Sequence, residues 1–429
     1  MKEEFNITSE EENSVQGVYA PKFMEWGLIS KENFSSVKDV PIKRWDPLST
    51  VFITSKDFGF REEHKRFYGH YSYLSPIRGK RPIASKTKEE QKYELGECSN
   101  TAWKGYKDVF MSVMEENLVY SEWGSPIGDG FTIIITEDEK RRDNPFLDQP
   151  HKIEKIPDSC KAITLINRYP AMARVVDPDV KSSIEKLLPS NSKLAEGINL
   201  ITISRKFYPS VCFNLIPEEI LAGIFLSMKE AILYAIEEAI ERDYYDIPVN
   251  SFFNIGSKVG GSQPRIHSQV YIDLSGDGHG SRLEGYLRAF KEMGDNCHLC
   301  KSTHDDNRRI ILDTDYWTFF TTGSPVRNYH IRFLPKEHIR RFTQLNVNQM
   351  SDLAKSLKIL FQALDDLEID KNRNILFNCC PYGYDANFHM FGDIIPHEII
   401  GGAEMADDMR VARKSPNDTA EEIRNAISS

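Results

Sequence analysis

The feature that most constrains the fold is an order of elements that the chain runs through twice. In each pass, a β-type run is followed by a long amphipathic helix pattern, a β-type run containing Phe-Asn, a turn and a last β-type run. The first pass spans 199–273 and the second spans 328–396. A repeat of this length predicts tandem duplication of a small α+β domain, although any α+β chain can give a similar string of elements.

The two helix patterns have recognisable starts and apolar faces. Pro217 stands near the start of the first helix, Glu218 and Glu219 fill its first turn, and Asn346 could cap the second helix. Side chains spaced three or four residues apart share one face of a helix, so they predict which residues enter the core. These are Ile220, Ile224, Met228, Ala231, Ala235 and Ala239 in the first helix, and Met350, Leu353, Leu357, Leu360, Leu364 and Leu367 in the second.

A register detail favours the duplication. Arg265 lies 11 residues after Asn254, and His389 lies 11 residues after Asn378. We therefore predict an α+β protein of two tandem domains, each an antiparallel sheet with a long helix. The expected boundaries are a polar N-terminal extension at 1–40, a first domain at 41–290 with an insertion at about 62–130, and a second domain at 291–429.

Composition disfavours two classes of partner. The net charge of −10, from 54 basic and 64 acidic residues, disfavours nucleic-acid binding, which requires a basic surface. No stretch approaches the ~20 apolar residues of a membrane span, so we expect no membrane partner. The polar, acidic start and the seven cysteines of this large chain predict reduced thiols and a cytoplasmic location.

The segment 254–269 holds the chemically informative residues. Three glycines and Ser262 precede a β-type run, and they predict a loop whose backbone amides can approach an oxyanion. His267 and Gln269 stand two residues apart, so on a strand both side chains would project from the same face. A neutral imidazole is a good nucleophile toward phosphorus, and a glutamine can donate to a phosphoryl oxygen without adding negative charge. The alternative is a glycine turn beside a half-buried polar histidine.

The pattern Asn-x-Gly-x-x-x-Gly-x-Ser-x-x-x-x-His-x-Gln at 254–269 resembles the active-site signature of galactose-1-phosphate uridylyltransferases, members of the histidine-triad superfamily. Further motifs follow in the order found in that family. They are SPIRGKRP at 75–82, INRYPAM at 166–172, CHLC at 297–300 and GGAEM at 401–405. The resemblance implies two histidine-triad-like domains, and a homodimer in which one subunit's C-terminal region completes the other's site.

The resemblance also implies roles for individual residues. His267 would be the nucleophile, and Gln269 and Ser262 would hold phosphoryl oxygens. Asn254 and Gly261 would belong to the phosphate-binding loop. The other expected substrate contacts are Arg78 and Arg81 for the phosphates, Asn167 and Tyr169 for the nucleoside, and Glu404 for the sugar.

The family's first domain often carries zinc on four residues, and here those positions read Asn144, Leu147, Phe207 and Arg265. None of these side chains is a ligand that zinc prefers, so we predict that this metal site is lost. Arg265 then stands two residues before His267, on the same strand face. Its guanidinium could bind a substrate phosphate or pair with a structural carboxylate.

A second metal site is predicted from Cys297, Cys300, His338 and His389. Two sulfurs and two imidazoles make a closed tetrahedral set for structural Zn2+. A lone Cys-x-x-Cys could instead be a redox pair or two buried thiols. The register favours metal because His389 stands at the position that corresponds to Arg265, and family members that resemble plant ADP-glucose phosphorylase carry such a zinc.

Other residues of the second half lack an obvious catalytic role. Phe391 stands at the position that corresponds to His267, and Asp393 at the position of Gln269, so this half is expected to be a support.

Two further histidines, His279 and His304, lie in polar stretches and are expected to be solvated.

Together these expectations give a nucleotidyltransferase of carbohydrate metabolism that works through a covalent intermediate on His267, in a ping-pong mechanism. The donor would be a nucleotide sugar or an NTP, and the acceptor a phosphorylated group such as a sugar phosphate. Two alternatives stay open. One is a nucleotide-sugar phosphorylase that uses inorganic phosphate, and the other is a non-catalytic nucleotide-binding or scaffold protein that kept the fold.

Overall fold

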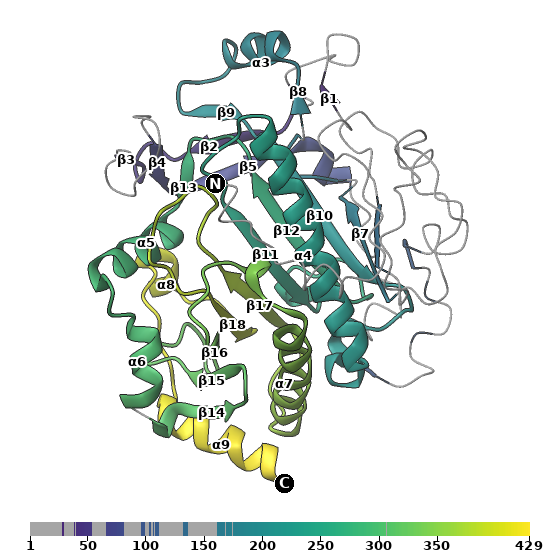
Figure 1. Ribbon diagram of the computed structural model, residues 1–429, viewed down its shortest axis with the longest axis vertical. Helices are drawn as coiled ribbons and strands as arrows, with labels where there is room; N and C mark the ends of the chain where they lie inside the picture. Colours follow the sequence, from purple (N-terminus) through teal and green to yellow (C-terminus); the bar gives the residue numbers. More distant parts are fainter. Residues whose placement is uncertain are drawn as a thin grey trace.

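The computed structural model describes residues 28–29, 38, 40–53, 66–80, 96–98, 103, 106, 108–110, 132–135, 161–167, 169–173, 175–305 and 307–429. One ten-stranded sheet forms the centre of the molecule, and two long helices lie on one of its faces (Figure 1). Every neighbouring pair of strands in this sheet is antiparallel. The expected class, mixed helix and strand with antiparallel sheets, is confirmed.

The central sheet consists of two sets of strands in the same arrangement, joined where β11 pairs with β17. In the first half the order from the outer edge is β6 (Thr132–Ile135), β7 (Ala162–Ile166), β10 (Gly197–Ser204), β12 (His267–Asp273) and β11 (Val249–Ile255). In the second half it is β14 (Ile310–Asp313), β15 (Trp317–Thr321), β16 (Ile331–Pro335), β18 (Phe391–Pro396) and β17 (Arg373–Asn378). Both sets of strands belong to one continuous sheet, so the sheet does not separate two domains. The division into two tandem domains therefore stays a prediction.

The two long helices form where the sequence predicts them. Helix α4 (Glu218–Glu241) follows β10, and α7 (Val347–Asp366) follows β16. Asn346 caps α7, since its Oδ1 accepts a hydrogen bond from the Gln349 amide at 2.9 Å. A cap of this kind stabilises a helix by ~1 kcal/mol. Apart from Leu367, which is partly buried beside the core, the residues of both predicted apolar faces are buried.

The core under these helices also joins the two halves. Phe225 on α4 meets Phe253 on β11, with ring centroids 5.9 Å apart, and Phe377 on β17, at 6.1 Å. Phe213 in the short helix η7 (Ser210–Leu215) stacks on Phe361 of α7 at 4.2 Å. Burial of one such aromatic side chain contributes about 1.5–3 kcal/mol. The two halves therefore share one hydrophobic core as well as one sheet.

Smaller elements surround the central sheet. One three-stranded sheet contains β2 (Ile42–Trp45), β5 (Tyr71–Leu74) and β9 (Ser192–Leu194), and another contains β3 (Val51–Ile53), β4 (Arg66–Gly69) and β13 (Gly278–Gly280). Leu28–Ile29 (β1) pairs with Val175–Val176 (β8). The other α-helices of the described part of the chain are α3 (Pro178–Glu185), α5 (Ser281–Met293), α6 (His298–Asp305), α8 (Gly402–Asp407) and α9 (Pro416–Ser428).

A buried ionic cluster attaches β2 and β5 to the end of β12. The Lys43 ammonium lies 2.9 Å from the Asp273 carboxylate and 3.0 Å from that of Asp277. Trp45 Nε1 also donates to Asp277, and the Tyr73 hydroxyl donates to Asp273. Burial alone would lower the pKa of Lys43, but the two carboxylates outweigh it and raise the pKa above its ordinary value. Lys43 is therefore charged, and the cluster fixes this small sheet beside the strand that carries His267.

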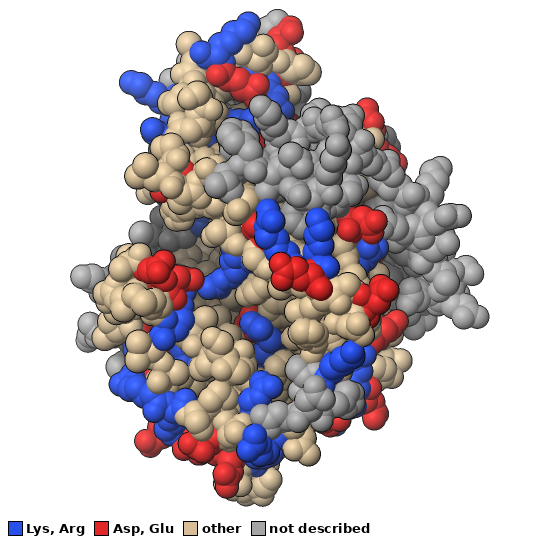
Figure 2. All heavy atoms as spheres, turned by 90° about the vertical axis from the view of Figure 1, so that its left-hand side faces the viewer, with Lys and Arg blue, Asp and Glu red and all other residues tan. Residues whose placement is uncertain are grey.

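The surface carries charges of both signs. On the face shown in Figure 2, Lys and Arg side chains are interspersed with Asp and Glu side chains. None of the helices in the described ranges is long and apolar enough to cross a bilayer.

Candidate active site and metal centre

His267 and Gln269 lie on β12 and project from one face of the sheet. Val270 and Ile272 on the same strand belong to the core cluster that contains the apolar side of α4. Since neighbouring side chains on a strand alternate, the odd-numbered residues point to the opposite face. The expectation that His267 and Gln269 share a face is therefore confirmed, and Tyr271 lies on that face too.

The hydrogen bond at His267 defines its tautomer. Its Nδ1 lies 2.8 Å from the backbone carbonyl oxygen of Arg265, and a carbonyl can only accept. Nδ1 must therefore carry the proton, which leaves a lone pair on Nε2. Burial lowers the pKa of His267, and it outweighs the opposing effects of this hydrogen bond and of the Asp108 charge. The imidazole is thus neutral at pH 7 and has the form that a nucleophile requires.

The glycine loop connects β11 to β12 and precedes His267 in the sequence. Gly256 and Gly260 have φ angles of 94° and 93°, a region that side chains with a Cβ rarely adopt. The Gly261 amide donates to the Gly256 carbonyl at 3.0 Å and closes the turn. Ser262 is partly buried and follows directly. The predicted loop is present, and it lies between Asn254 and β12.

Two of the expected substrate contacts lie together beside β12. Arg78, in the short helix η6 (Pro76–Lys80), donates to the Tyr169 carbonyl at 3.1 Å. Its guanidinium carbon is 6.0 Å from the centre of the Tyr271 ring. Asn167 is 8% exposed, and its Oδ1 accepts a hydrogen bond from the Tyr169 amide. The structure thus places Arg78 and Tyr169 on the His267 side of the sheet, whereas Arg81 lies outside the described residues.

Glu404 lies elsewhere, on α8 in the second half. Its carboxylate forms ion pairs with Arg327, at 2.8 Å, and with Arg410. Both partners belong to the second half, and among the described residues Glu404 forms no ion pair with a group beside His267. Its contact with a sugar stays a prediction.

Arg265, one of the four positions at which the resemblance predicts a lost zinc site, forms a buried ion pair. Its side chain is 1% exposed, and its Nε lies 2.6 Å from the Asp108 carboxylate. Its NH1 group donates to the carbonyls of Ser204 and Arg205 at 2.5 and 2.9 Å. Of the two alternatives for this guanidinium, the structure contains the pair with a carboxylate. Contact with a substrate phosphate stays a prediction.

Aromatic side chains surround the same position. Phe207 lies 5.7 Å from the Arg265 guanidinium and packs against Trp103 and Tyr106, with ring centroids 6.0 and 5.5 Å away. The Tyr106 hydroxyl donates to Gln263 Oε1 at 2.8 Å. An ion pair and an aromatic cluster therefore occupy two of the four positions at which the resemblance predicts a lost zinc site. The positions Asn144 and Leu147 of that set lie outside the described residues.

Sequence reasoning missed three residues of this region, Tyr106, Asp108 and Phe110. Phe110 lies 6.3 Å from the His267 ring, measured between centroids. All three fall in a stretch without periodicity, which gave no local signal. The one available indication was Arg265 itself. A guanidinium that is buried requires a carboxylate partner, so its presence on β-type sequence predicts an Asp or Glu nearby without saying which.

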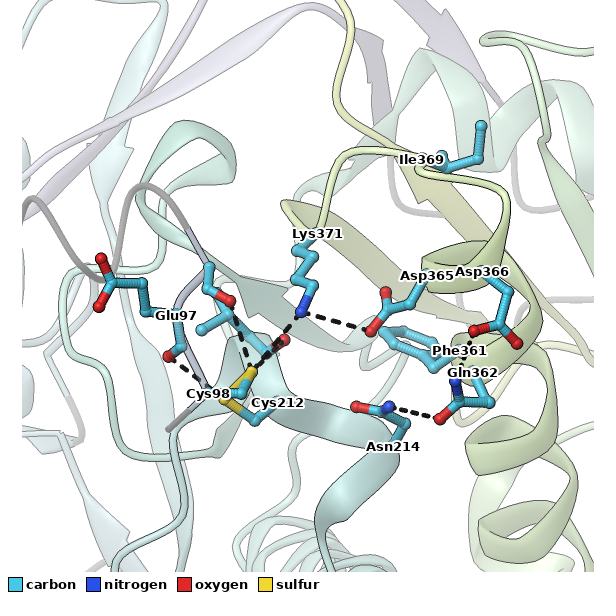
Figure 3. A network of polar contacts seen from close by, with 12 residues as sticks. Glu97, Cys98, Cys212, Asn214, Phe361, Gln362, Asp365, Asp366, Ile369 and Lys371 are labelled. Carbon is cyan, nitrogen blue, oxygen red and sulfur yellow. Dashed lines mark hydrogen bonds and ion pairs between the residues drawn. A yellow bond between two sulfur atoms is a disulfide. The ribbon is translucent and has the colours of Figure 1, made fainter. Parts of the chain in front are cut away.

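A disulfide between Cys98 and Cys212 anchors the start of this stretch (Figure 3). The expectation of reduced thiols is wrong for this pair, because the fold brings two cysteines 114 positions apart to a Cα separation of 5.5 Å. The Lys371 ammonium lies 3.7 Å from Cys98 Sγ and 3.6 Å from the Asp365 carboxylate. The disulfide therefore also contacts the second half. The expected cytoplasmic location stays a prediction.

The four predicted metal ligands come together in the second half. Their ligand atoms all lie within 4.8 Å of one another. Cys297 Sγ is 3.6 Å from His389 Nδ1, and Cys300 Sγ is 3.3 Å from that atom and 3.5 Å from His338 Nδ1. Zinc bonds of ~2.3 Å to sulfur and ~2.0–2.1 Å to nitrogen give a tetrahedral sulfur–nitrogen edge of about 3.5 Å. The group could hold a metal, and its donors and spacing fit zinc.

The orientation of His389 agrees with metal binding. Its Nε2 donates to the Pro335 carbonyl at 2.9 Å, which leaves Nδ1 for a metal. Burial and the neighbouring His338 lower the pKa of His389 to about 4, so the ring is neutral, as a ligand must be.

The positions of the second half that correspond to His267 and Gln269 hold two buried residues, Phe391 and Asp393. Phe391 is 2% exposed, and Asp393 pairs with Arg332 at 2.8 Å and His330 at 2.9 Å. Although its burial acts the other way, these partners hold the pKa of Asp393 well below its usual range.

The expected solvation of His279 is wrong. It is 1% exposed, and its Nε2 and Nδ1 lie 2.5 and 2.8 Å from Glu284 and Tyr384. The polar stretch around it forms β13, which pairs with β4. The side chain of His304 lies outside the described residues.

Comparison with known proteins confirms the resemblance. The galactose-1-phosphate uridylyltransferase of Haemophilus influenzae is 24% identical over 286 residues, which cover 59% of this chain and 82% of that protein. The corresponding Thermotoga maritima enzyme is 23% identical over 255 residues, covering 57% of this chain and 75% of that protein. No model of a protein family matches the chain.

Solved structures show a similar fold. A uridylyltransferase structure aligns with a TM-score of 0.53 at 19% identity, over 67% of this chain and 93% of its own. An ADP-glucose phosphorylase from Arabidopsis thaliana with bound ADP-glucose aligns with a TM-score of 0.51 at 17% identity. That alignment covers 88% of this chain and 98% of the phosphorylase. The fold of this chain is thus the one found in these two enzymes.

The first prediction concerns the buried pair of Arg265 and Asp108. We expect D108N to lower the free energy of unfolding by about 3–5 kcal/mol, because it leaves a buried guanidinium without a carboxylate. Denaturant unfolding measures the change. The double variant D108N/R265M should recover most of the loss, because it removes the charge as well. A single variant within ~0.5 kcal/mol of wild type would show that the pair does not stabilise the fold.

The disulfide generates the second prediction. C98S and C212S should each lower the free energy of unfolding by up to about 4–5 kcal/mol, because the bond closes a loop of more than a hundred residues in the unfolded chain. A dithiol reductant should lower the melting temperature of wild type to that of C98S and leave C98S unchanged. Equal melting temperatures for oxidised wild type and both variants would argue against the bond.

The third prediction concerns metal removal. The purified protein should contain about one zinc per chain by elemental analysis. C300S should lose it, with a fall of ~2 kcal/mol or more in the free energy of unfolding, which for a chain of 429 residues corresponds to roughly 2 °C or more in melting temperature. C379S is the matched control, because Cys379 is a free thiol outside the metal set, and it should keep its zinc. Zinc retained in C300S at the wild-type level would contradict the assignment.

Proposed function

We propose that this protein transfers a nucleoside monophosphate through a covalent nucleotidyl intermediate on His267. The observation that carries this proposal is the hydrogen bond from His267 Nδ1 to the Arg265 carbonyl. It directs the Nε2 lone pair away from the backbone, and burial keeps the ring neutral. A histidine in this state, behind a glycine loop and next to Gln269, has the features that nucleophilic attack on phosphorus requires.

The reaction has two displacement steps. In the first, Nε2 attacks the α-phosphorus of a nucleotide sugar or NTP, an Nε2–P bond forms, and the P–O bond to the leaving sugar phosphate or pyrophosphate breaks. The Nδ1 proton stays on the ring, and the Arg265 carbonyl stabilises the positive charge. In the second step a phosphate oxygen of the acceptor attacks the phosphorus and regenerates His267. This order is a ping-pong mechanism.

Groups around His267 would stabilise the charge on the phosphoryl oxygens. The loop amides around Gly261, the Ser262 hydroxyl and the Gln269 amide can each donate to an oxygen. Arg78 would approach the phosphates from the Tyr271 side, and Asn167 and Tyr169 would contact the nucleoside. Arg81 would add a second cation to this set.

A nucleotide-sugar phosphorylase is the second candidate. It would use the same intermediate, with inorganic phosphate as the acceptor. The similarity to the fold of the Arabidopsis ADP-glucose phosphorylase, which extends over 88% of the chain, favours this candidate. Release of a nucleoside diphosphate that depends on inorganic phosphate would distinguish the two.

We further propose that the second half, at 291–429, supports a catalytic first half at 41–290, and that Zn2+ on the Cys2His2 set stabilises it.

A homodimer would bring Glu404 to the partner's site. An exposed apolar stretch next to Glu404 supports a protein contact there, with exposed fractions of 90% at Ile399, 74% at Met405 and 82% at Val411.

The test is covalent labelling. Incubation with UDP-glucose, ADP-glucose, UTP or ATP labelled at the α-phosphate should leave acid-labile label on wild type and none on H267A. H279A is the matched control, because His279 is a buried histidine away from the loop, and it should still be labelled. Label on H267A, or none on wild type with any of these donors, would refute the proposal, and the latter result would favour a non-catalytic protein.

A further inference from the structure

The second half of the chain contacts the phosphate-binding loop through Asn374. Asn374 on β17 stands directly opposite Asn254 on β11. Its Nδ2 donates to Asn254 Oδ1 at 2.8 Å and approaches the Val259 carbonyl at 3.4 Å. One side-chain amide thus contacts both the strand before the loop and the loop itself.

This contact sets the polarity of the Asn254 amide. Because Oδ1 accepts from Asn374, Nδ2 must occupy the opposite branch of the amide. Among the residues that the structure describes, no acceptor takes a hydrogen bond from this Nδ2. It lies beside Gly260, where an added Cβ would be only 3.2 Å away. Phosphoryl oxygens only accept hydrogen bonds, so an amide in this orientation can bind one, and the flipped amide would repel it.

A second contact holds the loop from the same side. Asn372 is 1% exposed, and its Oδ1 accepts a hydrogen bond from the Lys258 amide at 3.0 Å. Asp370 fixes Asn372 in turn, through bonds of 2.9 and 2.8 Å to its backbone and side-chain nitrogens. A Cβ on Gly256 would lie 2.2 Å from Asn372 Oδ1, so the loop requires glycine there.

The corresponding asparagine of the second half differs in its contacts. Asn378 stands at the position of Asn254, but its Nδ2 donates to the Asp393 carboxylate at 3.0 Å. That carboxylate also binds Arg332 and His330. The Asn378 amide donor is therefore occupied by the protein, whereas no residue in the described ranges accepts from that of Asn254.

We propose that Asn374 is a positioning residue for nucleotidyl transfer, which orients the Asn254 amide so that its Nδ2 donates to a phosphoryl oxygen of the bound nucleotide. This inference rests on the proposed function. It assigns the second half a direct part in phosphate recognition, in which Asn372 and Asp370 hold the loop and Asn374 sets the direction of the donor.

The decisive variant is N374D, because it keeps the size of the side chain and reverses its hydrogen-bonding character. The new carboxylate only accepts, so the Asn254 amide must turn its Nδ2 inward and present Oδ1 to the nucleotide. The fold keeps the hydrogen bond between the side chains at 374 and 254 and loses only the longer contact with the Val259 carbonyl, while phosphate recognition loses one hydrogen bond. We expect the first-order rate of His267 labelling, and the equilibrium affinity for unlabelled UDP or ADP, to fall about 10- to 100-fold, the effect of one hydrogen bond to a charged group.

N378A is the matched control, because it removes one amide hydrogen bond from the same strand face. It should lower the melting temperature about as much as N374A does while leaving labelling and nucleotide affinity within about twofold of wild type. N374A should show the loss of affinity without the reversed polarity, and therefore a smaller loss than N374D.

The outcomes separate the two proposals. If wild type is labelled, and N374D is labelled and binds nucleotide as N378A does, the positioning role is wrong and the proposed function stands. If wild type binds nucleotide but takes no label, the proposed function is wrong, and the binding losses of N374D decide the positioning role. If wild type neither binds nor is labelled, both proposals are overturned.

Discussion

The pairing of β11 with β17 is the contact on which the rest of the structure depends. It joins two sets of strands into one antiparallel sheet, and Phe225 on α4 packs against both central strands on the helix side. On the open side the same pairing sets Asn374 against Asn254. A change in register would break both relations, because a shift by one residue would turn every side chain of β17 to the other face.

In the first half, an ion pair and aromatic side chains surround Arg265, which stands two residues before His267. Where the resemblance leads one to expect a metal ligand, Arg265 forms a buried pair with Asp108 and lies beside Phe207. Its backbone carbonyl accepts a hydrogen bond from His267 Nδ1, so the contact with His267 involves the backbone of Arg265 and not its side chain. In the second half, two sulfurs and two imidazoles form a group that could hold a metal, and Phe391 stands at the position that corresponds to His267.

Local sequence patterns predicted the features that depend on residues close together in the sequence. The apolar faces of α4 and α7, the Asn346 cap and the alternation of His267 and Gln269 follow from periods of 3.6 and 2. Contacts between distant segments gave no such signal. The Cys98–Cys212 bond, the burial of His279 against Tyr384 and the pair of Arg265 with Asp108 each join residues whose proximity only the fold creates. The metal set was predictable because ligand types and spacing restrict it strongly.

The central claim is that Nε2 of His267 forms a bond to phosphorus. Phosphorus NMR of the protein at neutral pH, after mixing with an excess of a nucleotide sugar and removal of free nucleotide, tests it most directly. The account predicts one protein-bound phosphoramidate resonance, which disappears when a sugar phosphate or inorganic phosphate is added and is missing in H267A. A wild-type spectrum without that resonance for any nucleotide sugar or NTP, or the same resonance in H267A, would contradict the account.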